Sequence, residues 1–294
     1  MSRKHAPLLA CALLAGGALR AESSEYPLVL NLPTAEMMQY WDIGVGFTHR
    51  FVQPVKDHGK DAYGLDGYTP AGLGFTFGIK SVKGLNLFIY RTVDNKTFTF
   101  GAQEQFLNGE RVRLAARVER YDEVVKQTIT PNYGKVGITG FALQVPTEIF
   151  ITDDLIFSVV PTYISQTSTQ DKSVILLNPA PGEPPITSPN SSGVFNIGLG
   201  LRYAVTEKCT LAGEYYPRPS KFANASPGGV TDGSKFQAGF AFGVSYKTFK
   251  HRFTLLGSNA LGTTANQVMS GDYAGVGPRP SSLWSLGFNV TRVF

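Results

Sequence analysis

Apolar residues alternate with small or polar residues along most of the chain. The clearest segment is "FNIGLGLRYAV" (195–205), in which large apolar side chains fall on one face of an extended strand and Asn, Gly, Arg and Ala fall on the other. The same period of two recurs in "WDIGVGFTHRF" (41–51), "LGFTFGIK" (73–80) and "FQAGFAFGVSYK" (236–247). This period is typical of β-strands with one apolar and one polar face.

Weaker segments extend the pattern to about 12 strands. The expected strands are 41–51, 71–81, 84–93, 97–107, 111–121, 136–151, 155–166, 194–205, 208–217, 235–248, 252–259 and 282–294. Short connections such as "NGE" and "TDD" alternate with long ones, and only "DNK" (94–96) breaks the series. This alternation is typical of bacterial outer-membrane barrels. We predict one all-β domain over residues 41–294, a transmembrane, antiparallel, up-and-down β-barrel of about 12 strands, with 10–14 possible.

The first residues predict export. A basic start is followed by the short apolar run "APLLACALLAGGAL" and by Ala21 as a small residue for cleavage. This arrangement predicts a signal peptide over residues 1–21, while Cys11 offers a less favoured lipoprotein site. No apolar run approaches the length of a membrane-spanning helix. We expect residues 22–40 to form a short periplasmic lead-in to the barrel.

Charge and cysteine content narrow the function classes. The chain has 27 basic and 22 acidic residues, and loss of Arg3, Lys4 and Arg20 with the signal peptide leaves 24 basic residues and a net charge of +2. This balance does not suggest a nucleic-acid partner. Cys209 is the one cysteine left in the mature chain, so an internal disulfide is excluded.

Charged residues on the predicted inner faces are the main candidates for function. They are Asp42, Arg50, Lys80, Arg113, Arg117, Glu119, Arg202 and Lys247. Charges inside a barrel must pair with one another or meet water. They therefore form either a structural network of ion pairs or a slightly basic path that prefers anions. Arg202 and Glu214 belong to one predicted hairpin and could pair diagonally, although the inner or outer position of Glu214 is ambiguous.

Catalytic and cofactor motifs are weak. His49, His58 and His251 are scattered, and no local motif places a serine beside one of them. Metal-ligand spacing is lacking, and no crossover helix is expected after glycine-rich stretches such as "GVGPRP". We expect no cofactor and no enzyme activity, with a lipid hydrolase built around His49 as a remote alternative.

Aromatic residues near strand ends suit the two membrane–water interfaces. The predicted girdle consists of Trp41, Tyr90, Tyr203, Tyr216, Tyr246 and Trp284. In the last strand, Phe288, Val290 and Phe294 fall on the apolar face. We predict that this strand is the signal read by the barrel-assembly machinery, which together with outer-membrane lipids would be the partner of the chain.

Several segments from one end of the chain to the other resemble a family of bacterial membrane-bound β-barrel proteins of unknown function. They are "HRF" after the first strand, "YGLDG", "LFIYRT", "VPTYI", "LGLRYAVTEKCTLAGEYYPR", "HRFTLLGSN" and "WSLGFNVTRVF". The resemblance implies a barrel in the bacterial outer membrane and supplies no activity. Arg292 departs from the pattern, because assembly signals usually carry an apolar residue there.

The sequence therefore predicts a small passive pore or transport barrel with a polar, slightly basic lumen. A non-conducting binding or structural barrel with a plugged lumen is the alternative, because about 12 strands lie between barrels filled by side chains and barrels with an aqueous channel.

Overall fold

The structure is a computed structural model that describes residues 26–39, 41–55, 65, 70–79, 84–93, 96–126, 135–166, 193–217, 237–269 and 281–294. The predicted signal peptide (1–21), Lys80 and His58 lie outside the described residues.

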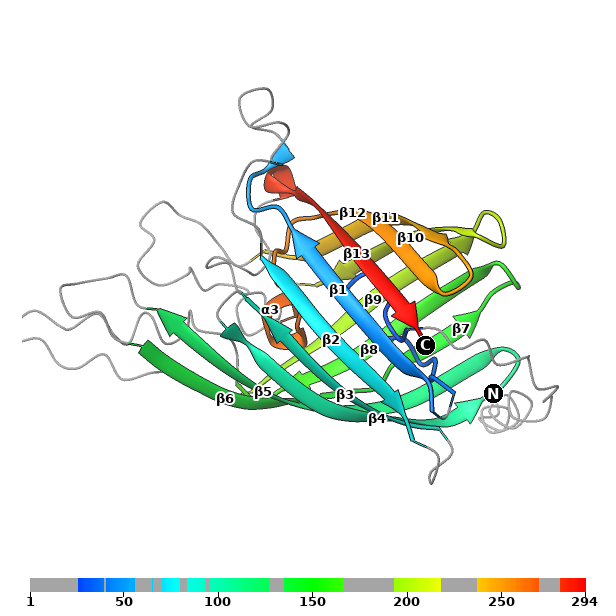
Figure 1. The fold of residues 1–294 in the computed structure, drawn as a ribbon, viewed down its shortest axis with the longest axis horizontal. Helices are drawn as coiled ribbons and strands as arrows, with labels where there is room; N and C mark the ends of the chain where they lie inside the picture. The colour runs from blue at the N-terminus through cyan, green and yellow to red at the C-terminus, as the bar shows by residue number, and fades with distance from the viewer. Residues whose placement is uncertain are drawn as a thin grey trace, which may run out of the picture.

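The described chain forms one antiparallel sheet that closes on itself (Figure 1). Its strands are β1 (Ile43–Arg50), β2 (Ala71–Gly78), β3 (Leu85–Thr92), β4 (Phe98–Asn108), β5 (Val112–Lys126), β6 (Lys135–Gln144), β7 (Thr147–Phe150), β8 (Leu155–Ile164), β9 (Val194–Ala204), β10 (Cys209–Tyr216), β11 (Gly239–Lys247), β12 (His251–Ser258) and β13 (Ser285–Val293). The helical elements are α3 (Ala265–Val268) and η5 (Ser281–Leu283). β1 pairs with β13 from Gly44↔Val293 to Arg50↔Gly287, which closes the ring.

β6 and β7 occupy one position in the wall. Both pair with β5 on one side and with β8 on the other. Val145 and Pro146 separate them, and proline has no backbone N–H to donate to the sheet. The predicted strand 136–151 is therefore one strand interrupted at Pro146, and the structure confirms a closed barrel of 12 strands.

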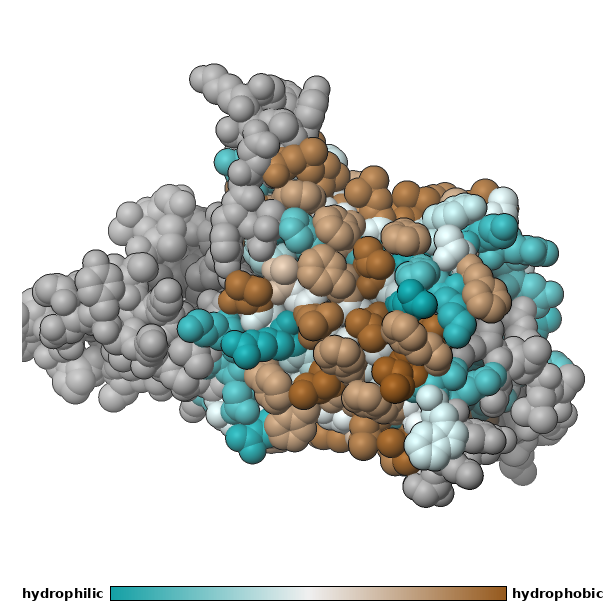
Figure 2. Space-filling view, viewed as in Figure 1, coloured by the Kyte–Doolittle hydropathy of each residue, from teal (hydrophilic) through white to brown (hydrophobic). Residues whose placement is uncertain are grey.

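The two faces of the wall follow the predicted alternation. In β2, buried Gly72, Gly74 and Thr76 alternate with exposed Leu73 and Phe75. Exposed apolar side chains occur on strands throughout the wall, and on the face drawn in Figure 2 they form a brown band. Such a band is the lipid-facing surface of a membrane barrel. None of the described helices has the length and apolarity needed to cross a membrane.

Residues 26–39 lie inside the barrel, whereas the sequence led us to expect a periplasmic lead-in. Leu30 and Ala35 are fully buried, and Val29 N–H donates to Leu32 O at 2.9 Å in a tight turn. We call residues 26–39 the N-terminal plug. Within it, the described β-bridge joins Leu28 to Pro33, so the segment adds no strand to the wall.

A second segment enters the lumen after β12. Residues 259–269, which contain α3 and which we call the inner loop, are buried over most of their length. Figure 1 shows α3 within the ring of strands. This segment belongs to the long connection between the expected strands 252–259 and 282–294.

Two apolar clusters join these segments to the wall. Leu32 of the plug and Met269 of the inner loop pack with Val160 and Ile164 of β8. Val29 and Leu30 pack with Leu256 of β12. Full burial of one such side chain contributes about 1.5–3 kcal/mol, so apolar contact is a large part of what holds the lumen closed.

The predicted aromatic girdle is wrong for Tyr90 and Tyr216. Both side chains point into the lumen, where Tyr90 OH lies 2.5 Å from Thr48 Oγ1 and Tyr216 OH donates to Glu214. Tyr203 and Tyr246 are exposed on the lipid face, as the girdle requires.

Candidate functional site: the occluded lumen

A carboxylate at the inner surface of β10 holds the turn of the N-terminal plug. Glu214 Oε1 accepts hydrogen bonds from the backbone N–H groups of Leu30 at 2.8 Å and Leu32 at 2.9 Å. The N–H of Asn31 lies 3.0 Å from both carboxylate oxygens. Glu214 is only 4% exposed. Consecutive backbone N–H groups that converge on an anion form a nest, and bonds to an ionised acceptor are the stronger kind.

The alternation of β10 explains why Glu214 faces inward. Glu214 and Tyr216 are buried, while Tyr215 between them is exposed on the lipid face. Arg202, which the sequence allowed to pair diagonally with Glu214, forms ion pairs with Glu148 and Glu36.

Arg50 of β1 and Asn289 of β13 also hold this turn. Arg50 Nη2 donates to Asn31 Oδ1 at 2.8 Å, and Arg50 Nη1 donates to Asn289 Oδ1 at 2.8 Å. Asn289 Nδ2 in turn donates to Leu30 O at 2.9 Å. The turn of the plug is therefore bonded to β1, β10 and β13.

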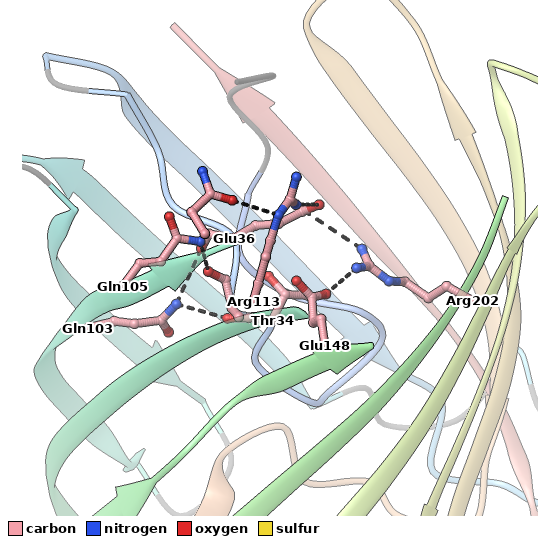
Figure 3. Close-up of polar contacts among 9 residues, drawn as sticks. Thr34, Glu36, Gln103, Gln105, Arg113, Glu148 and Arg202 are labelled. Carbon is pink, nitrogen blue, oxygen red and sulfur yellow. Dashed lines mark hydrogen bonds and ion pairs between the residues drawn. The ribbon is translucent and has the colours of Figure 1, made fainter. Parts of the chain in front are cut away.

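Amide side chains of β4 bind the second half of the plug. Gln103 Nε2 donates to Thr34 O at 2.8 Å and to Glu36 O at 3.2 Å, and Gln105 Nε2 donates to Ala35 O at 2.7 Å (Figure 3). These bonds satisfy backbone carbonyls that have no sheet partner.

Glu36, the one charged residue of the N-terminal plug, joins an ion-pair network. Its Oε1 lies 3.1 Å from Arg113 Nη1 and its Oε2 lies 3.8 Å from Arg202 Nη1. Figure 3 shows Arg113 of β5 and Arg202 of β9 pointing toward Glu36, with Glu148 of β7 below Glu36 on the same side of Arg202. The two carboxylates balance the two guanidinium groups.

Arg117 and Glu119 form a further pair on β5. Arg117 Nη2 lies 3.1 Å from Glu119 Oε2, and the guanidinium carbon lies 3.6 Å from the centroid of the Phe88 ring. Arg117 Nη1 also donates to Gln103 Oε1 at 3.4 Å, which links this pair to the residues that bind the plug.

The inner loop is bonded mainly through amide and hydroxyl groups. Gln267 Nε2 donates to Thr97 Oγ1 at 3.0 Å, and Asn266 Nδ2 donates to Glu123 Oε2 at 3.1 Å. Asn196 Nδ2 donates to Met269 O at 2.7 Å. These bonds tie the loop to wall strands on different sides of the lumen.

The remaining candidates from the sequence lie at the barrel end with the short connections. Asp42 and Lys247 line a cavity of about 220 Å³, together with Tyr26, Arg252 and Phe294. Burial raises the pKa of Tyr26 to about 12, so its phenol stays neutral.

The structure thus gathers five of the predicted lumen residues around the plug and places two at the rim. The gathered residues are Arg50, Arg113, Arg117, Glu119 and Arg202. Our sequence analysis missed Glu36, Glu123 and Glu148. The alternation of the predicted strand 136–151 contained the signal for Glu148, and Glu123 lies two residues beyond the predicted strand 111–121, which the structure extends to Lys126. The plug has no strand pattern that could have marked Glu36.

The model of a family described as "Membrane bound beta barrel domain (DUF5777)" matches residues 27–294. No curated protein matches the chain. This match confirms the membrane location and the family resemblance predicted from the sequence.

Similar solved structures are outer-membrane barrels. An outer membrane channel from Pseudomonas putida F1 is 13% identical, with 88% of this chain and 97% of that chain covered and a TM-score of 0.49. The NanC porin is 12% identical over 86% and 97% of the two chains, with a TM-score of 0.47. Outer membrane phospholipase A from Escherichia coli is 9% identical over 92% and 94%, with a TM-score of 0.39. At these identities the likeness concerns the fold alone.

Proposed function

The chain belongs to the family of membrane-bound β-barrel domains, and from this premise we propose that it is a non-enzymatic transport barrel of the outer membrane, closed at rest by its N-terminal plug. The bonds from Glu214 to the backbone of Leu30, Asn31 and Leu32 carry the proposal. They bury a wall carboxylate against a segment that is not part of the wall. This proposal replaces the open passive pore expected from the sequence by a closed one.

The plug is suited to leave the barrel without damage to the wall. Its described contacts with the wall are side-chain hydrogen bonds, the ion pairs of Glu36 and apolar packing. No ladder of backbone hydrogen bonds joins residues 26–39 to a strand in the described part of the chain. Release of the plug would therefore break no strand pairing, which is the property that a gate needs.

The positive and negative charges of the wall balance, so the wall prefers neither cations nor anions and suits small polar solutes. Among the described wall residues that surround the plug and the inner loop, the arginines are equal in number to the glutamates. They are Arg50, Arg113, Arg117 and Arg202, against Glu119, Glu123, Glu148 and Glu214. We therefore propose weak ion selectivity in the open state, in place of the anion preference expected from the sequence.

The surroundings of His49 support a role without catalysis. The His49 ring stacks on Phe288 with centroids 4.7 Å apart and meets Phe51 edge-on at 4.8 Å. Its Nδ1 has no hydrogen-bond partner among the described residues. A nucleophile and an orienting group would have to flank a catalytic histidine.

We also propose that β13 is recognised by the barrel-assembly machinery. Phe288 and Val290 lie on its outward face, and Phe294 follows it with 52% of its surface exposed. Phe294→Ala should lower the amount of assembled barrel in the outer membrane, whereas Phe249→Ala in an exposed turn should not. Equal assembly of both variants would contradict this role.

Conductance in a planar bilayer tests the gate. The purified intact protein should open only rarely, and a variant without residues 26–39 should give frequent, discrete current steps. Both proteins must show the gel mobility shift on boiling that marks a folded barrel. Steps of equal size and frequency from the intact protein would support the passive pore. A folded but silent deletion variant would support the structural or binding barrel.

A further inference from the structure

A cavity of about 70 Å³ remains between the N-terminal plug, the inner loop and the wall. Its lining is mixed. Leu30 and Leu32 of the plug, Val268 and Met269 of the inner loop and Phe88 of β3 supply apolar surface. Thr99, Arg117 and Glu119 supply polar groups on one side. Apolar walls with a few polar groups are typical of sites for small molecules.

Glu119 and Thr99 each bring to the lining a polar atom that has no hydrogen-bond partner among the described residues. Glu119 is 3% exposed, and its Oε2 accepts from Arg117 Nε at 3.3 Å and Nη2 at 3.1 Å. Its Oε1 has no hydrogen-bond partner among the described residues, and the same holds for Thr99 Oγ1. Buried polar atoms without partners are costly, so a molecule that supplies the missing bond is favoured here.

The chemistry of these groups limits what can bind. A carboxylate oxygen only accepts hydrogen bonds, so the molecule must carry a donor. Arg117 already neutralises Glu119, so an anion would face the carboxylate and a cation would face the guanidinium. A neutral molecule avoids both repulsions and the desolvation of a further charge.

The volume of the cavity limits the size of the molecule that it can bind. A buried water needs roughly 10–15 Å³ by the same measure, so the cavity holds about five non-hydrogen atoms. We propose that this cavity binds a small neutral alcohol, with its hydroxyl on Glu119 and Thr99 and its carbon chain among Phe88, Leu32 and Met269. As a statement about the transported solute, this proposal rests on the proposed transport function. Binding of the alcohol in the cavity does not itself require conduction.

Crystals of the full-length protein soaked in brominated probes test this site. The probes are 3-bromopropan-1-ol and 1-bromobutane, which have equal numbers of non-hydrogen atoms and differ in the hydroxyl group. We expect an anomalous bromine peak in the cavity with the alcohol, and about tenfold weaker binding of 1-bromobutane, because it leaves the bond to Glu119 unmade.

Two matched variants control the position of the peak. Ala265 lines the cavity, so Ala265→Leu should fill it and remove the peak. Ala116 is exposed on the lipid face, so Ala116→Leu should retain the peak. Equal binding of the two probes would overturn recognition of the hydroxyl group. Water in place of the alcohol, or a peak that persists in Ala265→Leu, would overturn the site. The conductance of the plug deletion is measured separately, so failure of this site leaves the gate testable.

Discussion

The carboxylate of Glu36 lies 3.1 Å from the guanidinium of Arg113, although the two residues are 77 positions apart in the chain. The pair is a charged contact between the N-terminal plug and the wall. Each partner is only 14% exposed, so removal of one charge costs more in this partly buried position than it would at the surface.

Glu36→Gln should therefore raise the frequency of channel openings about tenfold. The substitution weakens the binding of the plug to the wall by about 1–2 kcal/mol, which raises the ratio of released to bound plug about tenfold. Single-channel recording of the intact chain provides the measurement. Glu104→Gln is the matched control, because Glu104 is exposed on the same wall strand that carries Gln103. Equal opening rates in the two variants would show that Glu36 does not hold the plug.

Glu214→Gln should release the plug more strongly than Glu36→Gln. The substitution replaces a buried anion that binds three backbone N–H groups by an amide with one acceptor and two donors. Each lost bond to a charged acceptor is worth about 1.5–3 kcal/mol.

A cysteine at position 34 can report this release. Thr34 is fully buried and its hydroxyl has no partner among the described residues, so Thr34→Cys should leave the plug in place. In a Cys209→Ser background, a water-soluble maleimide should modify this thiol at least about tenfold faster when Glu214→Gln is added. Glu207→Gln, in an exposed turn, should leave the rate unchanged. A rate that Glu214→Gln does not alter would contradict the anchoring role of Glu214.

Strand alternation predicted the wall because lipid and lumen impose different demands on successive residues. Segments such as β9 and β11 show this clearly, with apolar side chains outside and Gly, Asn or Ser inside. The interrupted strand formed by β6 and β7 was also predictable, since the apolar phase continues across Pro146.

The contents of the lumen could not be predicted in the same way. Residues 26–39 contain Pro27 and Pro33 and have no period, because they pack against a curved inner wall rather than in a sheet. Tyr90 was misplaced because β3 has apolar side chains on both faces, with Phe88 inside and Leu87 outside. Such a strand does not show from its sequence which face meets lipid.

Removal of the plug should give a pore whose ion selectivity depends on Glu148. This buried carboxylate pairs with Arg202 on the wall and remains after residues 26–39 are deleted. In the deletion variant, Glu148→Gln removes a negative charge beside Arg202 and should shift the reversal potential in a salt gradient towards anions. Asp154→Asn, in an exposed turn, is the control. An unchanged reversal potential in Glu148→Gln would show that ions do not pass this part of the wall.

A side chain at Gly198 should push the plug away from the wall. A Cβ atom at this position would clash with Leu32 Cδ2 and would lie 3.0 Å from Met269 Cε, so the wall, the plug and the inner loop meet there without spare room. Overpacking of this kind costs about 1–3 kcal/mol. Because the plug is not part of the strand ladder, we expect it to yield before the barrel does.

Gly198→Val should therefore speed maleimide modification of Thr34→Cys about tenfold, while the gel mobility shift of the folded barrel is retained. Gly213→Val is the matched control, because a Cβ atom at Gly213 meets nothing within 4 Å. Both glycines lie in wall strands, so the two variants share the loss of backbone freedom and differ in contact with the plug. Equal modification rates would mean that Leu32 and Met269 adjust in place and that the plug stays bound.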